Sequence, residues 1–381
     1  MDVVVAAGGA DWEAAAIREI ESSPTLRLAR RCVDVADLLA VARTDLAAAA
    51  LVSAELSGLD ADTVYRLERS GIRVAAVEAD EADEARCRSL GIGRLLSLGR
   101  LDLVVRDISP LPMAFQDDRA PILAVWGPAG APGRSTVALA LASAAAARGT
   151  DTILVDADTY GGSLAQALSV LDDVSGLVAA CRAANNGRDA EILDHLLEVD
   201  PKLRLLSGLP RADMWPQVRT GALELVLSRL RTAAQLVVVD CGFSLEDGGG
   251  GPASRNQSTL HVLEVADTIV VVGRPDPVGL ARLVRGLHDL GEHFPGRTPT
   301  VVMNQMRTTL GWHEREVNQT LRRLAGVMPT AYLPFDQSGL DLALVSGRSP
   351  RQASPASPFV VRVEALATAL APRAGGTTSL P

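Results

Sequence analysis

The sequence PILAVWGPAGAPGRSTVALALASAAAARGTDTILVDADTYGGS, residues 121–163, decides the fold of the larger part of this chain. It begins with an apolar run at 122–126, which is typical of a buried strand. The turn that follows contains three glycines, Gly127, Gly130 and Gly133. Ser135 and Thr136 then open an Ala-rich helical stretch, whose first backbone amides can face an anionic phosphate. A strand, a glycine-rich turn and a helix in this order predict a nucleotide-phosphate site.

The turn resembles a P-loop, GxxxxGK[ST], with departures. Counting back from Gly133 places Pro128 at the first glycine and Arg134 at the lysine. Arginine carries a planar fork instead of the compact ammonium that reaches the β- and γ-phosphates, and Pro132 removes one backbone donor from the loop. We therefore predict phosphate binding of modest affinity, with Arg134 as a binding and catalytic residue and with ATP hydrolysis that is weak or lost. The alternative is a strand-to-helix turn without a ligand.

Acidic residues follow two further predicted strands. Asp156 and Asp158 come at the end of a strand at 152–155, and Asp240 comes at the end of a strand at 235–239. Ligands of open α/β sheets bind at this end of the strands, so we expect the three carboxylates to serve Mg²⁺ and an attacking water. The predicted magnesium ligands are Ser135, Asp156 and Asp240. Asp158 is the candidate for the water; the alternative is an aspartate that only caps the next helix.

Residues 1–108 alternate short apolar runs with helical stretches. Strands are predicted at 3–6, 26–29, 48–52, 73–77 and 94–98, which favours a small parallel sheet. This layout resembles a response-regulator receiver domain. In that family the third strand ends in a phosphorylated Asp, whereas the matching position here is about Ser53, and the first acid after the first strand is Asp11. We predict a receiver-like domain that cannot take phosphate and serves docking or dimerisation; the alternative is an unrelated doubly wound domain.

The remaining organisation follows from composition. Residues 109–120 are predicted to be a linker, 121–350 the nucleotide-binding domain, and 351–381 a C-terminal helix with a disordered tail. The helix, at about 359–371, has few basic residues and is expected to pack on the domain or a partner instead of lipid. The Gly-rich segment at 244–259 is predicted to be a mobile loop, either a switch region or a tolerated insertion.

Five landmarks together resemble the MinD/ParA superfamily of dimerising P-loop ATPases over about residues 121–350. They are the loop, DADTYGGS at 156–163, VVVD at 237–240, ADTIVVVGRPDP at 266–277, and the pair Asn304 and Pro334. Further strands are predicted at 268–272, at 300–303 with Asn304 at its end, and at 331–333, which leads into Pro334. The resemblance implies a mostly parallel doubly wound sheet, bound ATP with Mg²⁺, an Asn304 that reads adenine, and a Pro334 turn that closes over the base.

A degenerate receiver ahead of a MinD-like ATPase resembles CpaE/TadZ proteins of the actinobacterial type. This resemblance implies a homodimeric localisation protein that serves pilus or secretion machinery, or a septum or cell pole. The family marker is an extra lysine near the start of the loop that reaches across an ATP-bound dimer; Pro128 or Ala129 stands there. A nucleotide-dependent dimeric switch is the first hypothesis and a non-hydrolysing scaffold the second. A metabolic P-loop transferase is the third, although no cluster of His or Arg marks its substrate.

Composition limits the other classes. The 381 residues suffice for about two domains, and 48% are hydrophobic but only 3% aromatic, which indicates cores of small aliphatic side chains. A net charge of −9 disfavours strong nucleic-acid binding, and Arg282, Arg285, Arg322 and Arg323 are expected on solvated helix faces. No signal peptide or spanning run is evident, which predicts a cytoplasmic protein with peripheral membrane contact at most. Widely spaced cysteines predict free thiols.

Overall fold

A computed structural model describes residues 1–42, 44, 46–78, 80–105, 119–130, 132–170, 174–247, 254–310 and 312–370. The contacts between Cα atoms divide the chain into two compact units. The first comprises residues 1–118, 180–192 and 219–229, and the second comprises 119–179, 193–218 and 230–381. Most of the predicted linker at 109–120, the tail beyond residue 370 and the centre of the Gly-rich loop lie outside the described residues.

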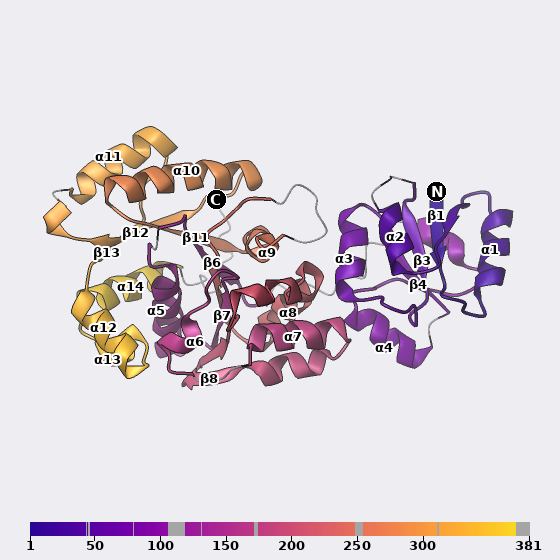
Figure 1. Ribbon diagram of the computed structural model, residues 1–381, viewed down its shortest axis with the longest axis horizontal. Coiled ribbons are helices and arrows are strands. Elements are labelled where there is room, and N and C mark those ends of the chain that lie inside the picture. The colour runs from indigo at the N-terminus through magenta and orange to yellow at the C-terminus, as the bar shows by residue number, and fades with distance from the viewer. Residues whose placement is uncertain are drawn as a thin grey trace, which may run out of the picture. The chain divides into compact units, whose positions relative to one another are not determined.

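The first unit begins with a regular alternation of strands and helices (Figure 1). The strands are β1 (Asp2–Ala6), β2 (Arg27–Arg31), β3 (Ala49–Val52), β4 (Arg73–Val77) and β5 (Leu95–Leu96). The helices are α1 (Glu13–Ser22), α2 (Val35–Val41), α3 (Ala61–Arg69) and α4 (Glu81–Ser89), followed by the 3-10 turn η1 (Leu101–Val105). Asp34, Asp60 and Asp80 start α2, α3 and α4 by accepting a backbone N–H of the first turn, 2.8 to 2.9 Å away.

The five strands form one parallel sheet, as the sequence predicted, and their order is β2-β1-β3-β4-β5. This is the flavodoxin-like order of doubly wound folds. Val4 and Leu51 lie in separate apolar clusters on the two faces of the sheet, which explains why β1 and β3 have no polar face, whereas the edge strand β2 (RLARR) is mostly exposed. Ser53, 6% exposed, follows the last residue of β3, and Asp11 is the first acid after β1.

The second unit contains the strands that position the site. They are β6 (Ile122–Trp126), β7 (Thr152–Ala157), β8 (Leu197–Asp200), β9 (Leu203–Leu206), β10 (Leu236–Cys241), β11 (Thr268–Gly273), β12 (Thr300–Met306) and β13 (Ala331–Pro334). Its sheet has the order β13-β12-β11-β6-β10-β7-β9-β8, and only β8 and β9 pair antiparallel. The sequence predicted the parallel strands of this sheet except β9, and it did not predict β8.

Helices and 3-10 turns fill the connections. The helices are α5 (Arg134–Ala147), α6 (Leu164–Ala167), α7 (Gly176–Asn185), α8 (Thr220–Ala233), α9 (Gln257–Val265), α10 (Pro277–His293), α11 (Glu314–Ala325), α12 (Gln337–Ser346), α13 (Pro350–Ala353) and α14 (Pro358–Leu370). The 3-10 turns are η2 (Asp189–His195), η3 (Ala212–Gln217) and η4 (Thr308–Leu310). Helix α5 contacts β6, β7 and β10, while α10 contacts β11. The helices α7 and α8 and the turn η2 have residues in both units.

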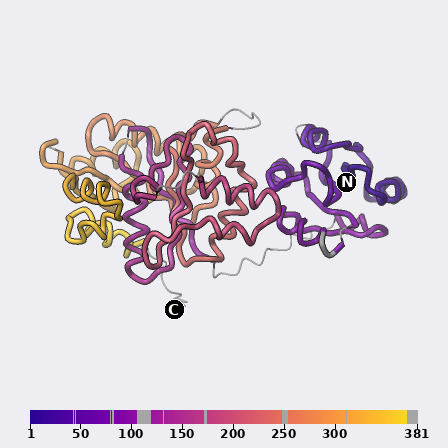
Figure 2. Tube along the Cα trace, turned by 60° about the horizontal axis from the view of Figure 1, so that its bottom comes forward, coloured from indigo at the N-terminus to yellow at the C-terminus, as the bar shows by residue number. Residues whose placement is uncertain are grey.

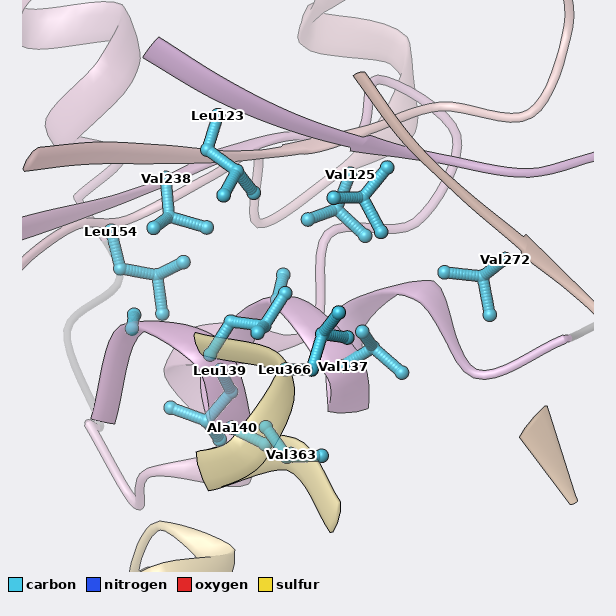
Figure 3. Packing of buried hydrophobic residues seen from close by; sticks show 14 of the residues in the cluster. Leu123, Val125, Val137, Leu139, Ala140, Leu154, Val238, Val272, Val363 and Leu366 are labelled. Atoms are coloured by element: carbon cyan, nitrogen blue, oxygen red, sulfur yellow. The ribbon is translucent and has the colours of Figure 1, made fainter. Parts of the chain in front are cut away.

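The C-terminal helix α14 packs on its own domain, which confirms one of the two predicted locations. Its Val363 and Leu366 meet Leu139 and Ala140 of α5 in the main core beneath the sheet (Figure 3). Phe359 is fully buried in the same core. In a second view the yellow trace of the C-terminal helices lies beside the orange trace that precedes it in the chain (Figure 2), and α14 contacts β13.

Among the described residues, none of the helices combines the length and apolar character needed to cross a lipid bilayer. The four cysteines, Cys32, Cys87, Cys181 and Cys241, are buried free thiols, as predicted.

Candidate functional site

The predicted loop and acids meet at one edge of the eight-stranded sheet. Strand β10 lies between β6 and β7, and Asp240 is in register with Val125 on one side and Asp156 on the other. The chain leaves β6 directly into the glycine-rich loop, so the loop and the carboxylates occupy the carboxyl ends of adjacent parallel strands. This is the edge at which open α/β sheets bind ligands.

Where the loop meets helix α5, the backbone leaves no space for a side chain. Gly133 precedes α5 and has a left-handed conformation with φ of +90°. A Cβ at this position would collide with Nδ2 of Asn304. Gly127 is equally confined, since a Cβ there would meet the backbone oxygen of Val272. Both glycines therefore let the loop backbone approach its neighbours closely.

Arg134 lies on the inner side of the loop. Its Nη1 donates to the backbone oxygens of Gly127 and Pro128 over 3.2 and 3.4 Å, and its Nη2 pairs with Asp158 over 3.4 Å. The side chain is only 12% exposed. The guanidinium thus clamps the loop to the strand that follows α5, while its buried Nε has no partner among the described residues.

Asp240 is the least satisfied group of the site. Its side chain is fully buried, and neither carboxylate oxygen has a hydrogen-bond partner among the described residues. Burial raises the pKa of Asp240 well above its usual value, and the negative charge of Asp156 raises it further. The hydroxyl of Ser135 approaches closely enough to lower this pKa somewhat, without the geometry of a formed hydrogen bond. A buried carboxylate with open lone pairs calls for a cation or a donor.

The other two acids already have partners. Asp156, 1% exposed, accepts the backbone N–H of Asp158 at 3.3 Å and that of Leu164 at 3.1 Å. Burial raises the pKa of Asp156 to about 6. Asp158 accepts the backbone N–H of Tyr160 at 2.8 Å besides its pair with Arg134. Asp156 therefore fixes the start of α6, and Asp158 is tied to the loop.

Asn304 does not end its strand, contrary to the sequence prediction. Strand β12 continues to Met306 because a bulge between Met303 and Met306 keeps it paired with β13. Asn304 is 3% exposed, and its Nδ2 donates to the backbone oxygen of Pro132 at 2.8 Å. It thus holds the loop, and its Oδ1 is buried without a partner among the described residues. Pro334 is the last residue of β13 and pairs with Met306.

Two arginines missed by the sequence reasoning also reach the loop. Nη1 of Arg274, just after β11, donates to the backbone oxygen of Gly130 at 3.4 Å. Nη1 of Arg282, in α10, donates to that of Ala129 at 3.5 Å. The sequence prediction placed Arg282 on a solvated helix face; it is exposed but also contacts the loop. No spacing signal marks it, since α10 packs beside the loop only in the folded sheet.

The donor set suits a magnesium ion that is completed by phosphate and water. Within the described ranges, no group of three or more His, Cys, Asp or Glu residues is arranged to hold a metal. Mg²⁺ is commonly held by one or two carboxylates together with substrate phosphates and waters. Ser135 and Asp240 meet that requirement, because one supplies a hydroxyl in the first turn of α5 and the other an unsatisfied buried carboxylate. Ser135 and Thr136 also border a cavity of about 90 Å³ beside α5.

Comparison with protein-family models and with curated proteins finds no match for this sequence. Solved structures with a similar fold include a ParA family ATPase from Chlorobium tepidum TLS, with a TM-score of 0.55 at 19% identity over 66% of this chain and 99% of that chain. The septum site-determining protein MinD complexed with Mg-ADP from Pyrococcus horikoshii OT3 gives a TM-score of 0.52 at 18% identity over 65% and 94%.

A chain of the MinC:MinD cell division protein complex from Aquifex aeolicus is similar as well. Its TM-score is 0.52 at 14% identity over 68% of this chain and 99% of that chain. At these identities the similarity shows the fold. The mostly parallel eight-stranded sheet of this chain, with the loop at the end of β6, therefore has the fold of the ParA and MinD ATPases.

Proposed function

We propose that this chain is a cytoplasmic ATP-binding protein of the MinD/ParA type, in which bound Mg-ATP switches the assembly state. The observation that carries the proposal is the placement of Asp240, an unsatisfied buried carboxylate, beside Ser135 at the start of the loop helix. A cation between the carboxylate and a phosphate on the loop would satisfy both. The fold shared with a MinD that was solved with Mg-ADP supports this assignment.

The site residues have proposed roles that follow from their positions. Backbone amides of the loop and of the first turn of α5, which includes Thr136, bind phosphate. Ser135 and Asp240 hold Mg²⁺, and Asp156 contributes through water, since both its oxygens already accept backbone donors. The glycines that shape the loop are Gly127, Gly130 and Gly133. Asn304 and Pro334 are proposed to border the adenine. The amino group of the adenine would donate to Oδ1 of Asn304, which has no partner among the described residues.

The proposed biological role is that of CpaE/TadZ proteins, acting as a homodimer that positions pilus or secretion machinery, a septum or a polar complex. Support comes from the order of the two units, a flavodoxin-like sheet followed by a ParA-like one. A structural relative assembles as a MinC:MinD complex, which is in keeping with recruitment of a protein partner. Ser53 at the end of β3 supports a receiver-like unit that docks or dimerises without taking phosphate.

A second candidate, a nucleotide-binding scaffold without turnover, is favoured by the state of Asp158. Its carboxylate is paired with Arg134 and bonded to the N–H of Tyr160. Each of its oxygens is thereby engaged by a donor, which leaves neither free to take a proton from an attacking water. Hydrolysis, in which Asp158 and Arg134 are the proposed catalytic residues, is therefore expected to be slow. Phosphate released from ATP over hours would support the switch, and no release would support the scaffold.

Calorimetry with Mg-ATP and Mg-ADP tests the proposal, on the wild type and on Arg134→Ala and Asp240→Ala. We expect affinity in the micromolar range for the wild type, strong loss in both variants, and no change in the exposed controls Arg322→Ala and Asp341→Ala. Light scattering should then show a dimer with Mg-ATP and a monomer without it. Absence of nucleotide binding by the folded wild type would refute the assignment.

A further inference from the structure

The loop does not present its own positive charge to a ligand. Arg134 is turned toward the backbone oxygens of Gly127 and Pro128 and toward Asp158, and its side chain is 12% exposed. An anion with the charge of a triphosphate needs compensating positive charge in addition to amides and a metal. The structure must supply this charge from outside the loop.

Arg274 and Arg282 supply guanidinium groups at the outer half of the loop. Arg282 lies directly against the α-carbon of Gly130, where a Cβ would collide with its Nη1. Its hydrogen bond to the oxygen of Ala129, and that of Arg274 to Gly130, are 3.5 and 3.4 Å long, near the limit for such contacts. A phosphate oxygen is a stronger acceptor for a guanidinium than a neutral carbonyl at this distance.

Arg282 also has space to turn. It lines a cavity of about 520 Å³ beside the loop, together with Trp126, Pro128, Phe243, Arg285 and Gly286. Glu246 and Asp289 line the same cavity, but neither forms an ion pair with Arg282 within the part of the chain that the structure describes. Arg274, in contrast, is anchored by Asp276 at 3.0 Å, and its side chain is 31% exposed.

We propose that Arg282, assisted by Arg274, contacts the terminal phosphate of a nucleoside triphosphate bound in the same subunit. This inference rests on the proposed nucleotide site and goes further, because it assigns the missing lysine charge to a helix outside the loop. Gly130 is then required to be glycine so that the guanidinium can lie over the loop. Arg282 and Arg274 would raise the affinity for a nucleoside triphosphate above that for a diphosphate, since only the triphosphate has a phosphate at this outer position.

Calorimetry on the full chain tests this with Arg282→Met, which keeps the aliphatic stem and removes the charge. We expect Mg-ATP affinity to fall about tenfold to hundredfold, and Mg-ADP affinity to fall less than about threefold. Arg274→Met should act in the same direction. Arg285→Met is the matched control, because Arg285 lines the same cavity from the same helix while its Nε bonds the Ala281 oxygen of its own helix. It should bind both nucleotides as the wild type does.

Unfolding curves without nucleotide separate a structural effect from a binding effect. Arg282→Met should keep the wild-type midpoint, and Arg282→Lys, which restores a charge, should regain part of the ATP affinity. Equal losses of ATP and ADP affinity in Arg282→Met would overturn this inference, and so would equal affinities of Arg282→Met and Arg285→Met. In either case, nucleotide binding by the wild type would still support the proposed function. A wild type that binds neither nucleotide would overturn both.

Discussion

Asn304 fixes the loop from a strand that lies two positions away in the sheet. Its Nδ2 bonds the oxygen of Pro132 and fills the volume that a side chain at Gly133 would need. The loop conformation therefore depends on a glycine and an amide that are far apart in sequence. The proposed nucleotide binding requires this conformation, because the first amides of α5 must point into the loop.

Gly133→Ala should abolish nucleotide binding and lower the free energy of unfolding by about 2 to 5 kcal/mol. The loss combines left-handed backbone strain with the collision at Asn304. Gly149→Ala is the control, since Gly149 also has a positive φ, +91°, but a Cβ there meets nothing within 4 Å. It should cost about 1 to 2 kcal/mol and leave binding intact. Equal effects of the two substitutions in calorimetry and denaturant unfolding would contradict the role of Asn304.

Asp240→Asn should stabilise the nucleotide-free protein, and the gain should grow with pH. Burial raises the pKa of Asp240, so above the ordinary aspartate pKa the native state holds a proton that the unfolded state releases. The free energy of unfolding then falls as pH rises through this window, by at most about 1.4 kcal/mol per pH unit. Asparagine cannot ionise and escapes this loss.

Denaturant unfolding at pH 5 and pH 7.5 measures the difference. Asp341→Asn, on the exposed side of α12, should change little at either pH. Mg-ATP should stabilise the wild type but not Asp240→Asn, because the variant lacks the carboxylate that is proposed to hold the metal. A gain that is the same at both pH values would show that Asp240 is not held neutral by burial.

At this scale the sequence predicted where the site lies better than how its side chains bond. The loop and Asp240 could be found because an apolar strand followed by glycine or acid is a local pattern. The pairing of Arg134 with Asp158 and the clamp by Asn304 could not be found, because Asp158 follows β7 and Asn304 lies in β12, and only the folded sheet brings them to the loop. Arg282 had no local signal, since only the packing of α10 brings it to the loop.

Helix α14 closes the core beneath the loop helix. Phe359, Val363 and Leu366 are buried with the apolar side of α5, while Val361 on the opposite side of α14 is 54% exposed. The helix that begins at the loop is thus supported along its length by the last helix of the described chain. Packing at α14 therefore sets how firmly α5 is held.

Phe359→Ala should lower the free energy of unfolding by about 3 to 5 kcal/mol, since it removes a fully buried aromatic side chain and leaves a cavity. Val361→Ala on the same helix should change it by less than about 0.5 kcal/mol. Urea unfolding monitored by circular dichroism provides both values. Similar losses for the two substitutions would mean that α14 does not pack as described.

Elements were predictable where a strand is buried on both faces. Such strands appear as continuous apolar runs, so β6, β10 and β11 could be located from sequence. The ends of β7 and β12 could not be predicted, because these strands continue as far as their neighbours pair with them. Strand β8, LEVD, is short, partly exposed and antiparallel, and it carries neither an apolar run nor a turn signal.

Each of the two units has buried apolar clusters of its own and contains buried cysteines. The reactivity of these thiols therefore measures how readily each unit opens. Cys32 and Cys87 belong to the core of the first unit, and Cys241 follows Asp240 in the second. Burial raises the pKa of Cys32 and Cys87 to about 11 and that of Cys241 well above its usual value. Buried thiols with few thiolates react only when the surrounding structure opens.

We therefore expect thiol labelling of the native protein at pH 8 to be slow at all four cysteines and fast in denaturant. Mg-ATP at about a hundredfold its dissociation constant stabilises the state that binds it by about 2.7 kcal/mol, which should slow labelling of Cys241 by about a hundredfold. Labelling of Cys32 and Cys87 should stay unchanged, because they lie in a cluster of the first unit that includes none of the residues of the proposed nucleotide site. Peptide mass spectrometry over a labelling time course separates the sites. Equal protection of all the cysteines would instead mean that the two cores open together as one cooperative unit.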